Sequence, residues 1–272
     1  MGPIGVFDSG YGGLTVLRCL QNRLAHADFL YLGDNARAPY GNRSYDLVYE
    51  FTRQAVMYLF DAGCPLVILA CNTASAKALR SIQQRDLPKL EDKGKRVLGV
   101  IRPTAEAIAA STRTGAVGLL GTPGTVASGS YDMEVAKAAP QVRLYSHACP
   151  MWVPLIENFE ADGDGADYFV KKDLTALFSQ APDIDTLILG CTHYPLLINK
   201  IEKYIPAGVN ILSQGALTAA SLEDYLKRHP EMAGRITQGG HTEYLTTEKP
   251  EKFDAAARLF LRVATRSQRV VL

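Results

Sequence analysis

Short apolar runs rich in β-branched residues alternate with helical patterns along the chain, and this alternation restricts the fold more than any other feature. A strand that is joined to the next strand through a helix gives parallel pairing. Repetition of this unit predicts an α/β fold, with parallel sheets flanked by helices. The expected strands lie at residues 4–7, 29–33, 66–70, 97–100, 116–121, 142–146, 186–190 and 209–212.

The starts of three expected helices carry residues that favour a helix N-terminus. Ser44 precedes YDLVYEFTRQAVMYLF, and Pro103 opens PTAEAIAAS. Either Asn72 or Thr73 precedes ASAKALRSI. Hydroxyl and amide side chains accept hydrogen bonds from the first turn, and proline has no N–H to lose there. These positions therefore predict where the helices begin.

Composition excludes several classes of protein. The 272 residues are 47% hydrophobic and 21% charged, with a formal net charge of +1, which is typical of a globular protein. No block of like charges provides a surface for nucleic acid or an anionic membrane. The apolar runs are far shorter than the roughly 18 residues of a membrane-spanning helix. The start, MGPIGVFDSG, has no pattern of an export signal, so we expect a cytoplasmic protein.

Two cysteines follow two of the apolar runs in matching contexts, VILACNTAS at 67–75 and LILGCTHYP at 187–195. The carboxyl ends of parallel strands are where ligands bind and where helix N-termini point. A helix N-terminus also favours the thiolate and lowers the pKa of a thiol from about 8.5. The polar residues beside Cys71 and Cys191 do not suit a core, so we expect both thiols in a ligand site.

The remaining cysteines, Cys19, Cys64 and Cys149, are interpreted as small buried hydrophobic residues. Five cysteines are an odd number, and none forms a C-x-x-C pair. We therefore expect neither disulfides nor a structural zinc site.

A third strand end, VFDSGYGG at 6–13, contains a carboxylate, a hydroxyl and three glycines. A dinucleotide-binding turn is the alternative interpretation. The fingerprint needs a third glycine at position 15, which is Thr15, and Asp8 would place negative charge beside a pyrophosphate. We therefore do not favour a nucleotide site.

Six segments stand in order along the chain: VFDSGYGG, LGDNARAPYG, ILACNTAS, LLGTPGTVASGSY, CPMWVPLIE and LILGCTHYPLL. In order and spacing they resemble the motifs of glutamate racemases, over almost the whole chain. The resemblance implies an isomerase that interconverts L- and D-glutamate without metal or other cofactor, and so supplies D-glutamate for bacterial peptidoglycan and cell shape. It also implies two similar α/β domains with the active site in the cleft between them, and a homodimer.

The resemblance carries roles over to individual residues. The two catalytic cysteines of the family fall on Cys71 and Cys191, and its supporting acid and base residues fall on Asp8, Glu157 and His193. Structural alternatives exist for Glu157, as a solvated helix residue, and for Thr122, as a helix cap. The implied substrate contacts are Asp8, Ser9, Tyr40, Gly41, Asn72, Thr73, Thr122, Thr192 and His193.

Racemisation explains why two thiols are needed. One group removes the α-proton from one face of the substrate, and a second group returns a proton to the other face. Cysteine suits both tasks because its thiolate is accessible near pH 7. We hypothesise that Asp8 assists Cys71 and that His193 assists Cys191. None of the six segments contains a lysine, and so none offers a Schiff-base anchor for pyridoxal phosphate.

Other functions remain open. An aspartate racemase would use the same two thiols, because substrate length depends on pocket depth. A metal hydrolase could use Cys71, Cys191 and His193, although these ligands have no short-spaced pair. A thiol redox sensor or an amino-acid binding module would keep the pocket without turnover.

The positions of the site residues suggest the domain division. Asp8 and Cys71 lie in the first part of the chain, whereas Thr122, Glu157 and Cys191 lie further along. We expect one domain to hold residues 1–98 and 208–272, including a terminal helix at 253–264. The other would hold residues 99–207, with the active site between them.

Overall fold

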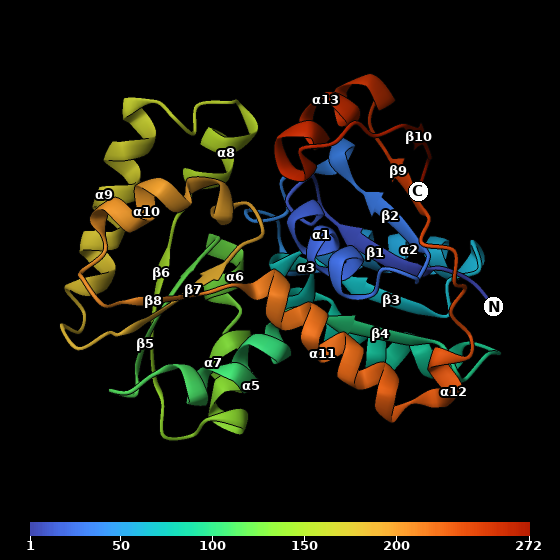
Figure 1. The fold of residues 1–272 in the computed structure, drawn as a ribbon, viewed down its shortest axis with the longest axis horizontal. Coiled ribbons are helices and arrows are strands. Elements are labelled where there is room, and N and C mark those ends of the chain that lie inside the picture. Colours follow the sequence, from blue (N-terminus) through green and yellow to red (C-terminus); the bar gives the residue numbers. More distant parts are fainter.

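The computed structural model describes residues 1–272, and its strands form two parallel sheets (Figure 1). All strand pairs are parallel. The six-stranded sheet has the order β10-β9-β2-β1-β3-β4, formed by Ile4–Asp8 (β1), Phe29–Gly33 (β2), Leu66–Leu69 (β3), Arg96–Gly99 (β4), Thr242–Thr246 (β9) and Ser267–Arg269 (β10). The four-stranded sheet has the order β6-β5-β7-β8, formed by Ala116–Gly121 (β5), Arg143–Ala148 (β6), Thr186–Gly190 (β7) and Asn210–Leu212 (β8).

Helices flank both sheets, which confirms the predicted α/β fold class (Figure 1). Around the six-stranded sheet they are α1 (Leu14–Arg23), α2 (Tyr45–Asp61), α3 (Asn72–Lys77), α4 (Leu79–Ser81), α11 (Gln214–Arg228), α12 (Pro230–Ala233) and α13 (Pro250–Leu261). Around the four-stranded sheet they are α5 (Ile101–Ser111), α6 (Pro123–Ala127), α7 (Ser130–Ala138), α8 (Trp152–Glu157), α9 (Asp164–Phe178) and α10 (Ile198–Tyr204). Short 3₁₀ or π turns are η1 (Asn35–Arg37), η2 (Ile82–Asp86), η3 (Leu87–Lys89) and η4 (Tyr194–Leu197).

Successive side chains of a strand point to opposite sides, and the central strands β1, β2, β3, β5 and β7 are buried on both faces. In β1, Val6 packs in the core that contains α1, α11 and α13, whereas Phe7 packs in the core that contains α2 and α3. In β5, Leu120 packs toward α8, α9 and α10, whereas Leu119 packs with α5 and α7. This double burial explains the continuous apolar runs that identified these strands.

Of the three expected helix starts, one agrees with the structure and two differ. Ser44 caps α2 as predicted, since its side chain accepts a hydrogen bond from the N–H of Leu47. The cap of α3 is Cys71, rather than Asn72 or Thr73, and its sulfur accepts from the N–H of Ala74. Pro103 does not open α5, which begins at Ile101. Proline is tolerated there because the N–H groups of the first turn have no partner within the helix.

The expected boundary at residue 208 is wrong for β8, which pairs with β7 and extends the four-stranded sheet. The chain returns to the larger sheet through α11, which packs against α1 and α5. The terminal helix α13 packs on α1 and β10 and ends at Leu261. The division into two domains otherwise stays a prediction.

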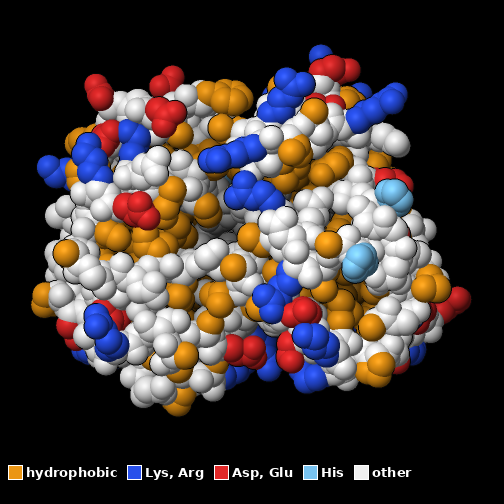
Figure 2. Space-filling view, viewed as in Figure 1, with side chains coloured by type: hydrophobic (Ala, Val, Ile, Leu, Met, Phe, Trp, Pro, Cys, Tyr) orange, Lys and Arg blue, Asp and Glu red, His pale blue; other side chains and the backbone are white.

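The surface carries charges of both signs. Figure 2 shows Lys and Arg side chains scattered among Asp and Glu over one face of the molecule, with small hydrophobic areas between them. No helix of the protein combines the length and the apolar character that crossing a membrane requires.

Candidate active site

A cavity of about 50 Å³ lies where the carboxyl ends of strands from both sheets meet. Segments that follow β1, β2 and β3 line it from one side, and segments that follow β5, β6 and β7 line it from the other. The structure thus brings together eleven of the twelve residues expected in the site: Ser9, Tyr40, Gly41, Cys71, Asn72, Thr73, Thr122, Glu157, Cys191, Thr192 and His193. The twelfth, Asp8, is buried directly before Ser9.

The thiol of Cys71 is buried at the start of α3. Its sulfur lies 3.3 Å from the hydroxyl of Ser9 and accepts a hydrogen bond from the N–H of Ala74 at 3.4 Å. Burial, together with the negative charge of the nearby Asp8, raises the pKa of Cys71 to about 12. The expected lowering by the helix N-terminus is therefore wrong for this thiol, because desolvation outweighs the helix field.

Asp8 ends β1 beneath the cavity and is almost fully buried. One carboxyl oxygen accepts from the N–H of Gly10 at 2.9 Å, while the other has no hydrogen-bond partner. Burial raises the pKa of Asp8, although the positive charge of His193 acts against this. A carboxyl group with a raised pKa next to a thiol is suited to proton exchange.

Cys191, His193 and Glu157 form a chain of polar contacts on the opposite side. The sulfur of Cys191 lies 3.8 Å from Nδ1 of His193, and Nε2 of His193 lies 3.0 Å from the Glu157 carboxylate. Burial by itself lowers the pKa of His193, but its contacts with Cys191 and Glu157 together raise it to about 10. The imidazole is therefore cationic at neutral pH, and it attracts negative charge on the Cys191 sulfur.

Three threonine hydroxyls join the two halves beside the cavity. Thr73 lies 3.0 Å from Thr122 and 3.3 Å from Thr125, and Thr122 lies 3.0 Å from Thr125. Thr122 also caps α6, since its hydroxyl accepts from the N–H of Thr125 at 3.2 Å. The interpretation of Thr122 as a helix cap is confirmed, and the same side chain lines the cavity; its contact with the substrate stays a prediction.

Tyr40 has its hydroxyl engaged away from the cavity. It donates to the buried carboxylate of Asp34, which also accepts from Arg37 at 2.7 Å. Burial raises the pKa of Tyr40, so the phenol stays neutral. Asp34 thus fixes the segment that contains Tyr40 and Gly41 along one wall.

The sequence interpretation missed part of the lining. Cys149 was expected only as a core residue, yet it borders the cavity directly after β6. It follows a strand end, as Cys71 and Cys191 do, but Ser146 and His147 before it interrupt the apolar run that identified the other two. The prolines and Val153 of the next segment add an apolar wall.

The protein has no group of three or more His, Cys, Asp or Glu side chains placed to hold a metal ion. A metal hydrolase would need Cys71, Cys191 and His193 to converge on one point. The structure therefore gives no support to that alternative.

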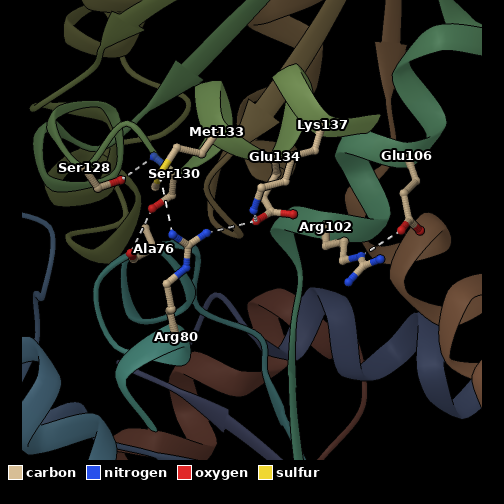
Figure 3. A network of polar contacts seen from close by, with 9 residues as sticks. All are labelled: Ala76, Arg80, Arg102, Glu106, Ser128, Ser130, Met133, Glu134 and Lys137. Carbon is tan, nitrogen blue, oxygen red and sulfur yellow. Dashed lines mark hydrogen bonds and ion pairs between the residues drawn. The ribbon is translucent and has the colours of Figure 1, made fainter. Parts of the chain in front are cut away.

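A second cavity, of about 530 Å³, lies between α4, α5, α7 and α11 and contains none of the predicted residues. Figure 3 shows its polar wall, where Arg80 reaches Glu134 and Arg102 reaches Glu106. Ser130 donates to the carbonyl of Ala76 at 2.9 Å. The contacts of Arg80 and Ser130 join α4 and α3 to α7 and so connect the two halves, whereas the Arg102–Glu106 pair lies within α5.

Comparison with known proteins agrees with this geometry. Residues 4–222 match the family model described as Asp/Glu/hydantoin racemase. The chain belongs to this family. A glutamate racemase of Ruegeria sp. (strain TM1040) is 44% identical over 269 residues, which is 95% of this chain and 96% of that protein.

Solved structures of the family share the fold. A glutamate racemase isoform from Bacillus anthracis has a TM-score of 0.90 and 35% identity, with 100% of this chain and 98% of that chain covered. The enzyme from Francisella tularensis, solved with D-glutamate, has a TM-score of 0.85 and 31% identity, with 99% and 97% covered. An aspartate racemase from Picrophilus torridus has a TM-score of 0.55 and 16% identity, with 96% and 99% covered, which shows a shared fold only.

Proposed function

We propose that this protein racemises glutamate by a two-thiol mechanism and so supplies D-glutamate for the cell wall. The observation that carries the proposal is the cavity itself. Cys71 and Cys191 line it from different sheets, and each has its own buried acid or base partner. The relatives named above, which are glutamate racemases, support the same substrate.

In the direction from L- to D-glutamate, the Cys191 thiolate takes the α-proton, so that a C–H bond breaks and an S–H bond forms. The electron pair stays on the substrate as a planar carbanion. The Cys71 thiol then gives its proton to the opposite face and becomes the thiolate. In the reverse direction the two thiols exchange roles. The assignment of Cys191 to the L-isomer follows from the family resemblance.

The protonation states in the structure suit the first of these directions. The pKa of about 12 keeps Cys71 protonated and ready to donate, while the pKa of about 10 keeps His193 cationic beside Cys191. The raised pKa of Asp8 lets its carboxyl group hold a proton that it can return to the Cys71 thiolate after this reaction. Cys191 thus has a cation that stabilises its thiolate, and Cys71 has a carboxyl group that can supply a proton.

Neutral donors suit the two carboxylates of the substrate. Ser9, Asn72, Thr73, Thr122 and Thr192 line the cavity, whereas no lysine or arginine does. Hydroxyl and amide donors bind a carboxylate without placing a fixed cation beside the thiolate. Recognition by these residues stays a prediction.

Chiral analysis tests the function and its alternatives. Purified protein is incubated separately with L-glutamate and L-aspartate, after dialysis against chelator and without pyridoxal phosphate. We expect glutamate to approach equal amounts of both isomers and aspartate to change far more slowly. Faster turnover of aspartate would identify an aspartate racemase. Absence of turnover would favour a binding module or redox sensor, and activity restored only by zinc would contradict a metal-free mechanism.

We also infer a cytoplasmic homodimer, as the resemblance implies. Light scattering on purified protein measures the oligomeric state directly. A mass near one chain, 29.6 kDa, across the working concentrations would contradict the dimer.

A further inference from the structure

A buried group of four polar side chains lies behind the cavity and connects both halves. Asn72 begins α3 next to Cys71, and Gln214 begins α11. Tyr131 belongs to α7 and Thr104 to α5. All four are buried, so water does not compete for their hydrogen bonds.

The amides of Asn72 and Gln214 pair reciprocally. Nδ2 of Asn72 donates to Oε1 of Gln214 at 2.6 Å, and Nε2 of Gln214 donates to Oδ1 of Asn72 at 3.1 Å. The Tyr131 hydroxyl also donates to Oδ1 of Asn72, at 2.7 Å. Oδ1 of Asn72 thus accepts from two donors, and Nδ2 faces an acceptor. Only one orientation of the Asn72 amide satisfies all three contacts.

This orientation leaves one N–H of Asn72 unused. An amide nitrogen carries two hydrogens, and within the protein Nδ2 of Asn72 donates only to Gln214. Asn72 lines the active cavity, and the remaining hydrogen suits a carboxylate oxygen of the substrate. We propose that Gln214 is a positioning residue that sets the Asn72 amide for binding a substrate carboxylate.

The contacts of Gln214 demand a neutral side chain that both donates and accepts. It must accept from Asn72 and also donate, since Nε2 lies 2.6 Å from the Tyr131 hydroxyl and 3.2 Å from that of Thr104. Apolar residues provide neither function, and an ionised carboxylate only accepts. Because Tyr131 and Thr104 belong to helices of the four-stranded sheet, Gln214 also fixes Asn72 relative to that half.

The inference rests on the proposed function, and a double-mutant cycle tests it. Gln214→Met, Asn72→Ala and the double variant are assayed with L- and D-glutamate. Asn72→Ala removes the hydrogen bond to the substrate carboxylate, and Gln214→Met removes the contact that orients it, so we expect KM to rise about 10-fold or more for both isomers, with kcat changed far less. The double variant should be no worse than Asn72→Ala, because Gln214 acts through Asn72.

Gln214→Glu gives a second, independent measurement. A buried glutamic acid has a raised pKa, and when protonated it donates and accepts as glutamine does. We expect its KM to fall toward that of the unmodified protein as pH is lowered. The KM ratio of Gln214→Met to unmodified protein should stay constant over the same range.

Thr218→Val is the matched control, because Thr218 is buried one turn further along α11 and donates to the backbone carbonyl of Gln214 at 2.8 Å. It should lower Tm and leave KM unchanged. Additive KM effects in the double variant, or an equal KM rise in Thr218→Val, would contradict a positioning role. Calorimetric affinities for D-glutamate are measured on the same variants. If the unmodified protein binds D-glutamate without turnover, the proposed function is wrong. The affinities of the variants for D-glutamate then still test the role of Gln214.

Discussion

At the scale of single residues, we expect racemisation to require both thiols, so that loss of either one alone stops it. Serine at either position has a pKa far above neutrality, so Cys71→Ser and Cys191→Ser should each lose racemisation by orders of magnitude. A glutamate analogue with a β leaving group needs only the abstraction step. We expect Cys71→Ser to eliminate from the L-analogue and Cys191→Ser from the D-analogue, as followed by release of the leaving group. Equal handling of both analogues would point to other bases, such as Asp8 and His193.

We expect Glu157 to influence the pH dependence of activity through the pKa of His193. Glu157 and Cys191 together raise the pKa of His193 against its burial, so Glu157→Gln should lower that pKa. His193 then loses its proton at lower pH, and the alkaline limb of kcat/KM for L-glutamate should move to lower pH by about one unit or more. Glu160→Gln, an exposed position in the same segment, should leave the profile unchanged. An unmoved limb in Glu157→Gln would exclude this coupling.

At the scale of elements, Thr122 links the start of α6 to the site. Thr122→Val keeps the shape but removes the hydroxyl that accepts from Thr125, and loss of such a cap costs about 1 kcal/mol. For a chain of this size we expect Tm to fall by about 2–4 °C in calorimetry. Thr122→Ser keeps the cap and serves as the control. Equal Tm values for Thr122→Val and Thr122→Ser would show that the cap contributes little to stability.

At the scale of the whole molecule, the site exists only where the two halves meet, so substrate should shield its thiols together. Cys71 and Cys191 are each 6% exposed, while Cys19 is half-buried outside the cavity. We expect iodoacetamide to inactivate the protein, and D-glutamate to slow labelling of Cys71 and Cys191 but not of Cys19. Peptide mass spectrometry measures each site. If D-glutamate does not change the labelling rates of Cys71 and Cys191, these thiols lie outside the substrate site.

The sequence predicted the central strands most clearly because they are buried on both faces. The runs at 29–33, 116–121 and 186–190 match β2, β5 and β7 residue for residue. The segments TEYLT and SQR gave no such signal, and they are the outer strands β9 and β10. Their strand character comes from pairing with β2 and with each other, which no local pattern records.

By itself, the sequence determined that Cys71 and Cys191 end two strands of a parallel α/β fold, because hydrophobic period and local polarity are properties of neighbouring residues. Only the tertiary structure decided that the pKa of Cys71 is raised, since its burial depends on distant segments. The same holds for Gln214, which meets Asn72 across 142 positions of the chain. Desolvation and long-range hydrogen bonds arise from packing, and packing is fixed only when the whole chain has folded.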